Sequence, residues 1–496
     1  MILGQLCDEA MRIEAILQVI QSVTVRGDRS LDVTGVAYDS RVVRPGHLFV
    51  ALPGSRRNGM EFVDDAIRRG AVAVVTEQRL PRRVAATHIQ VEDARRALAE
   101  IACAFYNHPS ARLRMIGITG TNGKTTTAYM ARAILRAAGR RPGMIGTVVY
   151  EMGDRCIPAG RTTPEAPDVQ AMLDQMLRNG CDSAVMEVSS HALDQKRVWG
   201  VDFDVGVFTN LTRDHLDYHG TIERYFAAKT LLFRGLGQME KRAAAVINLD
   251  DEWGQQLANI GGGWSAGFTY GFHPAADIRA EDAEFVSDGV VFRLRTPWGD
   301  ADARLRTLGR FNVQNALAAV GACGALGVPV ADMVRALAGF AAAPGRLEPV
   351  PNARGVRVFV DYAHTDDALN NVLGMLRGQG GGRLIVVFGC GGDRDRGKRP
   401  LMGAAAARWA DHVILTSDNP RSEDPRRIIE EIAAGVPAGA SCERIEEREA
   451  AIARAIEMAR PGDTVLIAGK GHENYQEFDR TVIPFDDREV ARRHLS

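Results

Sequence analysis

The sequence predicts an α/β protein of three domains: a small N-terminal α/β domain, a central nucleotide-binding domain and a C-terminal Rossmann-like doubly wound domain. The chain has 496 residues, which is too long for one hydrophobic core. Short apolar strands alternate with amphipathic helices along it, a pattern typical of parallel sheets covered by helices. We expect the domains to span residues 1–112, 113–343 and 344–496.

The first domain carries the runs of a small α/β unit. Strands are expected at 33–38, 47–52 and 71–75, and helices at 64–69 and 94–106. Two of its loops, Tyr38 to Arg41 and Ser55 to Gly59, are polar and basic enough to hold a nucleotide diphosphate. Solvated turns are the simpler explanation of both loops on these residues alone.

The central domain opens on a glycine turn, Gly120 to Lys124, between an apolar strand at 114–119 and an amphipathic helix. The two glycines let backbone N–H groups approach an anion, and the helix N-terminus adds partial positive charge. Lys124 can reach terminal phosphates, and Thr125 can place its hydroxyl on Mg²⁺. Ile118 stands where the strict phosphate-loop pattern has glycine, so an ordinary glycine turn is the alternative.

Polar residues also follow two later strands of this domain, 183–188 and 204–208. Glu187 lies at the end of the first, where ligands bind in open α/β sheets, and its carboxylate suits Mg²⁺. A helix cap is the alternative role for Glu187. His215 follows the second strand, and a hydrogen-bonding loop histidine is its simpler interpretation, because Mg²⁺ prefers oxygen.

Two helices of the central domain carry polar residues of less certain meaning. Lys229 lies in the expected helix 225–233, where a lone lysine is normally at the surface. Asn315 lies in the helix that begins near Arg310, and its amide suits the edge of an adenine. A place on the helix surface is the alternative for Asn315.

The third domain alternates four strands with four helices. The strands are expected at 356–360, 383–388, 412–416 and 464–468, and the helices at 367–376, 398–409, 425–434 and 450–459. This order predicts a parallel doubly wound sheet. Because no G-x-G-x-x-G follows the first strand, an NAD-dependent oxidoreductase is disfavoured. The loops after the strands supply both charges through Arg394, Asp418, Arg421 and Glu473, which suits a zwitterionic ligand. Each loop alone would be read as a charged surface turn.

Composition limits the partners and the compartment. A formal net charge of −1 gives no support for nucleic acid as the main partner. The seven cysteines are scattered without a C-x-x-C pair, which argues against disulfides or a zinc site and for a reducing cytoplasm. The N-terminus is typical of an amphipathic helix, and the longest apolar run, 316–331, is interrupted by glycines. We therefore expect no signal peptide and no membrane insertion.

Five motifs occur together and in order along the chain: Gly120-Thr121-Asn122-Gly123-Lys124-Thr125-Thr126, Glu187-Val188-Ser189-Ser190-His191, Asn312-x-x-Asn315, Asp361-Tyr362-Ala363-His364 and Asp418-Asn419-Pro420-Arg421. In this combination the chain resembles the Mur ligases over all three domains. The variant glycine turn with Ile118 is also the variant that this family carries.

The resemblance implies a cytoplasmic step of peptidoglycan synthesis, and through it a contribution to cell-wall formation, cell shape and cell division. ATP would phosphorylate the D-glutamate carboxylate of UDP-N-acetylmuramoyl-L-alanyl-D-glutamate. The amine of meso-diaminopimelate would then attack the acyl phosphate to form an amide and release phosphate. Mg²⁺ is the implied cofactor and no side-chain nucleophile is needed. We expect a monomer whose domains close on binding.

The resemblance also implies roles for individual residues. ATP would be held by Gly120, Thr121, Asn122, Gly123, Lys124, Thr125, Thr126, Asn315, Arg346 and Asp361. The nucleotide-sugar dipeptide would be held by Tyr38, Ser40, Ser55, Arg56, Arg57, Thr162, Thr163, Ser189, Gln195 and Arg197. Diaminopimelate would be held by Arg394, Asp418, Asn419, Pro420, Arg421, Gly469 and Glu473. The catalytic and metal-associated residues would be Lys124, Thr125, Glu187, His215 and Lys229, with Lys229 modified to N6-carboxylysine, a carbamate.

The amino acid that is added is the sharpest expectation. The loop from Asp418 to Arg421 resembles the diaminopimelate version, and Arg421 offers a partner to the distal carboxylate that lysine lacks. An L-lysine-adding ligase, a folylpolyglutamate synthase and a non-catalytic nucleotide-binding regulator are the alternatives. Two positions depart from the family pattern: Asp366 stands where proline is common, and Arg161 stands where some relatives have asparagine.

Overall fold

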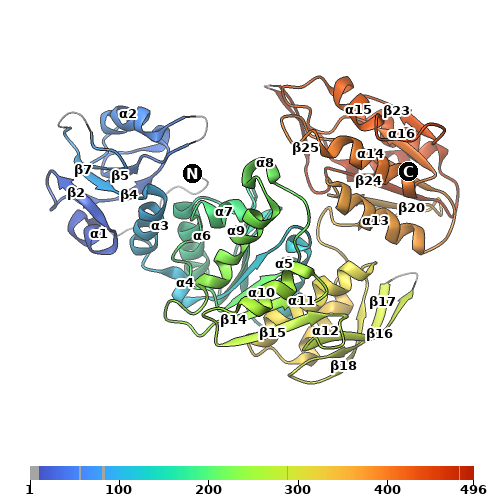
Figure 1. Cartoon of the computed structure of the whole chain (residues 1–496), viewed down its shortest axis with the longest axis horizontal. Coiled ribbons are helices and arrows are strands. Elements are labelled where there is room, and N and C mark those ends of the chain that lie inside the picture. The colour runs from blue at the N-terminus through green and yellow to red at the C-terminus, as the bar shows by residue number, and fades with distance from the viewer. Residues whose placement is uncertain (1–9, 55–56, 81–83, 287–288, 480) are drawn as a thin grey trace.

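The computed structural model describes residues 10–54, 57–80, 84–286, 289–479 and 481–496. They form three α/β parts, and the N-terminal and C-terminal parts lie on either side of the central one (Figure 1). The expected three-domain α/β architecture is confirmed, whereas the domain boundaries near residues 112 and 343 stay predictions. Among the described residues, we find no helix with both the length and the apolar character needed to cross a bilayer.

The N-terminal part is a five-stranded sheet in the order β2-β7-β6-β5-β4. Its strands are β2 (Ser22–Arg26), β4 (Gly35–Ala37), β5 (His47–Val50), β6 (Ala73–Thr76) and β7 (Thr87–Val91). Its main helices are α1 (Ile13–Val19), α2 (Val63–Arg68) and α3 (Ala94–Phe105), and β1 (Met11–Arg12) pairs with β3 (Asp32–Val33) apart from the sheet. Helices α1 and α3 bury one face of the sheet and α2 the other. Strands β2 and β7 were not predicted from the sequence.

The central part is built on eleven strands in the order β11-β10-β9-β12-β8-β13-β14-β15-β16-β17-β18. The parallel strands are β8 (Arg114–Thr119), β9 (Pro142–Ile145), β12 (Ser183–Glu187), β13 (Val205–Phe208), β14 (Ala244–Asn248) and β15 (Ala266–Gly271). The edges are β10 (Val149–Met152) and β11 (Arg155–Pro158) on one side and β16 (Ile278–Val286), β17 (Gly289–Arg295) and β18 (Ala301–Leu305) on the other. On one edge, β9, β10 and β11 pair in antiparallel fashion. On the other, β16, β17 and β18 are antiparallel to one another, whereas β16 is parallel to β15.

Helices cover both faces of the central sheet. One face is buried under α5 (Lys124–Ala137), α11 (Arg310–Ala325) and α12 (Val330–Gly339). The opposite face is buried under α6 (Ala166–Arg178), α9 (Ile222–Gly235) and α10 (Glu252–Ile260). The short helices α4 (Pro109–Arg112), α7 (Ser190–Asp194) and α8 (Leu216–His219) lie in connections. Strand β8 therefore lies in the middle of a covered sheet and delivers the glycine turn at its carboxyl end.

The C-terminal part has the expected doubly wound sheet. Its strand order is β19-β20-β24-β21-β22-β23, with all pairs parallel except β19 with β20. The strands are β19 (Glu348–Pro349), β20 (Arg357–Asp361), β21 (Leu384–Phe388), β22 (His412–Leu415), β23 (Cys442–Arg444) and β24 (Thr464–Ala468). One face packs against α13 (Asp366–Gly378), α14 (Lys398–Trp409) and α15 (Pro425–Ala433), and the other against α16 (Arg448–Met458) and α17 (Asp487–Leu495).

A buried ion pair fixes α16 and α17 beneath the strand ends. Arg448 and Asp487 are both wholly buried, and Arg448 donates to both carboxylate oxygens, each at 2.7 Å. Arg448 also donates to the carbonyl oxygens of Ser417, at 3.2 Å, and Ala468, at 2.9 Å, which follow or end β22 and β24. The pair therefore holds the loops that carry the charged residues of this domain.

Replacing Arg448 with methionine is expected to destabilise the C-terminal part by about 3–5 kcal/mol, because Asp487 would keep a buried charge without a partner. Hydrogen exchange of the β24 amides in the wild type and the variant measures the loss. The control is R448M combined with D487L, which removes both charges and should recover much of that loss. Equal protection in R448M and the wild type would contradict the expectation.

Candidate active site

The glycine turn after β8 is shaped by close approach of neighbouring segments. Gly120 and Gly123 have φ angles of +148° and +87°, which residues other than glycine rarely adopt. A Cβ atom would lie 1.9 Å from Thr209 Oγ1 at Gly120 and 2.3 Å from Asn315 Oδ1 at Gly123. Neither position accepts a larger residue, and the turn opens directly onto the N-terminus of α5, where backbone N–H groups favour an anion.

Two lysines converge on one backbone carbonyl of this turn. Lys124 Nζ lies 2.9 Å from the Gly120 oxygen and 2.8 Å from the Thr121 oxygen, and Lys229 Nζ lies 2.8 Å from the same Gly120 oxygen. The expectation of a surface lysine at 229 is wrong, since its exposed fraction is 1% and its Nζ lies 4.4 Å from the Tyr225 ring centroid. The helical spacing could have predicted this burial, because residues 225, 229 and 233 share one face of α9.

Burial and like charge act on both amines. Burial lowers the pKa of Lys229 well below its ordinary value, and the neighbouring charge of Lys124 lowers it further. Burial also lowers the pKa of Lys124, although Glu187 acts in the opposite direction. A neutral amine at Lys229 relieves the repulsion between the two groups.

Glu187 ends β12 with an exposed fraction of 1%. Its Oε2 accepts from Thr125 Oγ1 at 2.8 Å and from Thr147 Oγ1 at 2.9 Å, and its Oε1 accepts from Thr147 N–H at 2.8 Å. The alternative of a helix cap does not hold, because Ser189 caps α7. Thr147 was not predicted from the sequence. It follows the end of β9, and both of its donors bind this carboxylate.

His215 is the N-cap residue of α8 and lies in the left-handed region, with φ of +54°. Its Nε2 lies 3.3 Å from Asp214 Oδ2, and its ring meets those of His191 at 4.8 Å and Tyr225 at 6.0 Å. Desolvation lowers the pKa of His215 to about 4, against the opposing effect of Asp214. The imidazole is therefore neutral at pH 7, the state in which a histidine can bind a metal.

The oxygen donors beside Glu187 suit Mg²⁺. The carboxylate and the Thr125 hydroxyl are adjacent hard oxygen donors of the kind Mg²⁺ prefers. The contacts of the described residues join His215 to Asp214 rather than to Glu187. Within the same residues, no group of three or more His, Cys, Asp or Glu side chains is arranged to hold a metal. Thr125 and Glu187 therefore fit the ion as two adjacent oxygen ligands.

The residues expected around adenosine lie at the meeting of the central and C-terminal parts. Asn315 is 7% exposed and faces the glycine turn, so the surface alternative is wrong. Arg346 Nη2 lies 3.1 Å from Thr125 Oγ1, and its guanidinium lies 4.6 Å from the Tyr362 ring centroid. Asp361 ends β20 and accepts N–H bonds from the backbone, and burial raises its pKa.

The residues expected around the dipeptide form a connected network that starts at Glu187. Thr163 Oγ1 donates to the Glu187 carbonyl oxygen at 2.8 Å, and Arg197 Nη1 donates to the Thr163 carbonyl oxygen at 3.0 Å. Three further contacts extend it: Ser189 N–H to Thr163 Oγ1 at 3.1 Å, Arg197 Nη2 to Gln195 Oε1 at 2.6 Å, and Thr162 Oγ1 with Thr147 Oγ1 at 3.1 Å. Arg161 instead pairs with Glu165.

The N-terminal part reaches the central part through Tyr38. Its hydroxyl donates to Asp168 Oδ2 on α6 at 2.6 Å, and burial raises the pKa of Tyr38. Ser40 is buried at the start of a short 3₁₀ helix, Ser40–Val42, and its hydroxyl bonds to Asp65 and lowers the pKa of that carboxyl. Arg57 is exposed, and Ser55 and Arg56 lie outside the described residues.

The loops after β21, β22 and β24 meet at one edge of the C-terminal sheet. Asn419 Nδ2 donates to Glu473 Oε2 at 2.8 Å, and a Cβ at Gly469 would lie 2.6 Å from Asp418 Oδ2. Burial and the charge of Asp418 raise the pKa of Glu473. The alternative of separate surface turns therefore fails for Asp418 and Asn419, which are 7% and 2% exposed, whereas Arg394 is exposed.

Lys470 was missed in this cluster. It is wholly buried, and its Nζ donates to Asn419 Oδ1 at 3.0 Å and Glu473 Oε2 at 3.2 Å. Its place in the glycine-rich loop after β24 was the available signal, since it stands between Gly469 and Glu473. Its charge offsets that of the neighbouring carboxylates.

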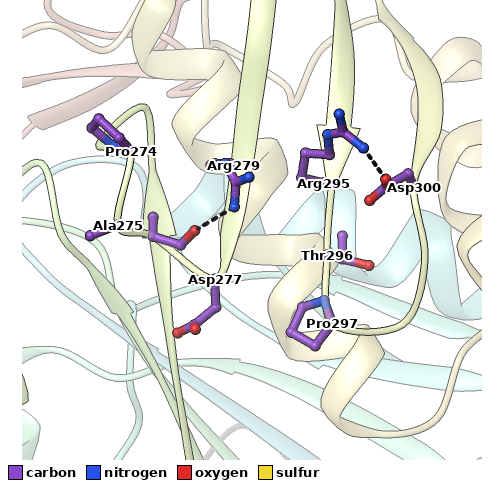
Figure 2. Close-up of a pocket in the computed structure, with 9 residues that line it drawn as sticks. Pro274, Ala275, Asp277, Arg279, Arg295, Thr296, Pro297 and Asp300 are labelled. Atoms are coloured by element: carbon purple, nitrogen blue, oxygen red, sulfur yellow. Dashed lines mark hydrogen bonds and ion pairs between the residues drawn. The ribbon is translucent and has the colours of Figure 1, made fainter.

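A hollow of about 390 Å³ lies elsewhere, on the antiparallel extension of the central sheet (Figure 2). Arg279 donates to the Ala276 carbonyl oxygen, and Arg295 pairs with Asp300. Both arginines also bind Glu281. The charges around this hollow are balanced by near neighbours, and none of the residues expected at the site lines it.

The comparisons with known proteins agree with this geometry. Models described as the Mur ligase family catalytic domain, the Mur ligase middle domain and the Mur ligase glutamate ligase domain match residues 32–106, 118–323 and 345–471. A UDP-N-acetylmuramoyl-L-alanyl-D-glutamate--2,6-diaminopimelate ligase of Solibacter usitatus (strain Ellin6076) is 49% identical over 468 residues, which is 94% of each chain. A protein of the same name from Geobacillus thermodenitrificans (strain NG80-2) is 47% identical over 97% of this chain and 99% of its own.

A solved structure of a UDP-N-acetylmuramoyl-L-alanyl-D-glutamate--2,6-diaminopimelate ligase matches with a TM-score of 0.70 at 35% identity. The match covers 98% of this chain and 99% of that one. With three family domains matched in order and relatives of this identity over nearly its whole length, the chain belongs to the Mur ligase family.

Proposed function

We propose that this chain is an ATP-dependent ligase of peptidoglycan synthesis that joins meso-diaminopimelate to UDP-N-acetylmuramoyl-L-alanyl-D-glutamate. The observation that carries the proposal is the hydrogen-bonded path from Thr125 through Glu187 and Thr163 to Arg197. It connects the turn suited to a phosphoryl donor with residues suited to a carboxylate-bearing acceptor. The relatives named for this reaction support the same assignment.

The chemistry follows from the weakness of a carboxylate as an acylating agent. Phosphorylation of the D-glutamate side-chain carboxylate gives an acyl phosphate, in which phosphate is a good leaving group. The amine then attacks the acyl carbon, and the tetrahedral intermediate collapses to an amide and releases phosphate. Lys124 and the turn N–H groups neutralise charge on the transferred phosphoryl group. Arg197 holds the acceptor, and the C-terminal loops hold the incoming amino acid.

The metal site belongs to the same proposal. Thr125 and Glu187 would hold Mg²⁺ together with His215 and the carbamate of Lys229. The ion, when bound, offsets the negative charge of the ATP phosphates. The carbamate forms when the neutral Lys229 amine attacks the carbon of CO₂ and releases one proton. The lowered pKa of Lys229 favours the neutral amine that this step requires.

The cellular setting of this function is the cytoplasm, where the nucleotide-sugar precursor and ATP are available. We propose that the protein acts as a monomer, because each of its three domains contributes residues to one site within a single chain. A sedimentation-velocity experiment with all substrates would detect a dimer, and a dimer would overturn this part of the proposal.

An amino-acid panel tests the function. With UDP-N-acetylmuramoyl-L-alanyl-D-glutamate, ATP and Mg²⁺, the protein should release phosphate and form the tripeptide with meso-diaminopimelate. Its kcat/KM for L-lysine should be lower by about 10²-fold or more, since lysine leaves Arg421 without a carboxylate. Arg421→Ala should remove most of that preference, whereas Arg427→Ala, on the exposed side of α15, should not. Equal kcat/KM for both amino acids would contradict the proposal.

A further inference from the structure

A β-hairpin after the last strand of the C-terminal sheet packs against Arg421. It consists of β25 (Tyr475–Phe478) and β26 (Thr481–Pro484). Arg421 N–H donates to the Glu477 carbonyl oxygen at 3.0 Å, and Asp479 N–H donates to the Arg421 carbonyl oxygen at 2.6 Å. The φ angle of Arg421 is +52°, a conformation that a residue with a side chain keeps only where its surroundings hold it. The hairpin supplies that support.

The same hairpin orients the Arg421 side chain. Nε donates to Glu477 Oε2 at 3.0 Å, and Nη1 donates to the Gly392 carbonyl oxygen at 2.8 Å. A guanidinium has five N–H groups, so these two bonds leave three, two of them on Nη2. Among the described residues, Nη2 has no hydrogen-bond acceptor. The end formed by Nη1 and Nη2 is therefore available to an outside acceptor.

Glu477 also reaches the oppositely charged half of the cluster. Its N–H donates to Asn419 Oδ1 at 3.1 Å, and Asn419 in turn donates to Glu473 Oε2. One residue of the hairpin thus fixes a cationic group and an anionic group at the same edge of the sheet. Their spacing is what a substrate with a distal ammonium and a distal carboxylate must match.

We propose that Glu477 is a specificity-determining positioning residue, which holds the Arg421 guanidinium in the plane that receives the distal carboxylate of the amino-acid substrate. This inference rests on the proposed function. Arginine has a long side chain whose fixed plane is needed for two parallel bonds to a carboxylate. Without Glu477 the guanidinium loses its hydrogen bond at Nε and becomes less ordered. Substrate binding must then restore that order, and the entropy cost weakens the binding.

The test compares kcat/KM for meso-diaminopimelate and L-lysine in variants of the full chain. Glu477→Ala should raise KM for meso-diaminopimelate about tenfold with little change in kcat, and should lower kcat/KM for L-lysine by twofold at most. Glu477→Gln keeps an acceptor oxygen without the charge and should stay within about threefold of the wild type. Glu457→Ala is the matched control, since its side chain is 77% exposed.

A double-variant cycle shows whether Glu477 acts through Arg421. If it does, E477A adds no further loss to R421A, because the group that it positions is gone. Additive losses, equal losses for both amino acids, or tighter binding in E477Q would overturn the inference. If the wild type selects meso-diaminopimelate and E477A selects it equally well, the inference is wrong but the proposed function stands. A wild-type chain that forms no amide with meso-diaminopimelate overturns the proposed function as well.

Discussion

Replacing Lys124 with alanine is expected to lower kcat for tripeptide formation by about 10³-fold, or roughly 4 kcal/mol of transition-state stabilisation. The lysine lies at the start of α5, and its Nζ reaches the carbonyl oxygens of the turn at 2.8 and 2.9 Å. A bound phosphate is a stronger hydrogen-bond acceptor than these carbonyl oxygens. The Lys124 side chain can therefore turn from the carbonyl oxygens to the phosphate while the backbone of the turn keeps its conformation. The charge is then fixed beside the transferred group.

Quenched-flow measurement of product formation and phosphate release tests this expectation. The Kd for the nucleotide-sugar dipeptide should be unchanged in K124A, because its expected contacts lie at Thr163 and Arg197 and not at the turn. Calorimetry of dipeptide binding therefore separates a catalytic loss from misfolding. Tripeptide formation at the wild-type rate would remove Lys124 from the mechanism and leave the glycine turn without its proposed role.

Local patterns predicted the parts of the fold that consist of buried parallel strands and amphipathic helices. The strands β8, β21 and β24 are short β-branched runs, and the structure gives them within a residue or two of the expected bounds. The edge strands β16 and β17 were not foreseen. Their residues alternate between polar and apolar over a hairpin exposed on one face, which carries a weaker signal than a fully buried strand.

The candidate site divides along a similar line. Glu187 was predicted because a carboxylate at the end of a buried strand in an open α/β sheet faces the crevice where ligands bind. Thr147, Lys470 and Glu477 were not selected, because their importance lies in contacts with residues 40, 51 and 56 positions away along the chain. Such contacts follow from the order of strands in each sheet, which single-sequence patterns do not fix. The resemblance to the family, rather than chemistry, drew attention to Lys229.

Replacing Lys229 with alanine is expected to lower kcat by about 10³-fold, and short carboxylates such as acetate should restore part of the activity. An ordinary lysine, with a pKa near 10.4, is neutral in fewer than about one molecule in 10³ at pH 7. Burial and the charge of Lys124 lower the pKa of Lys229, so its neutral fraction is larger and reaction with CO₂ becomes favourable. An added carboxylate can take the place of the missing carbamate oxygens.

The rescue must be specific to the missing carbamate. Acetate should have no effect on the wild type or on K124A, whose lost group is a cation. Wild-type protein supplied with ¹³C-bicarbonate should show a carbamate carbon resonance that is absent from K229A. If that resonance is missing from the wild type, or if removal of CO₂ leaves its rate unchanged, Lys229 acts as an amine. The amine would then stay on the Gly120 carbonyl oxygen beside Lys124, and the proposed metal site would lose a ligand.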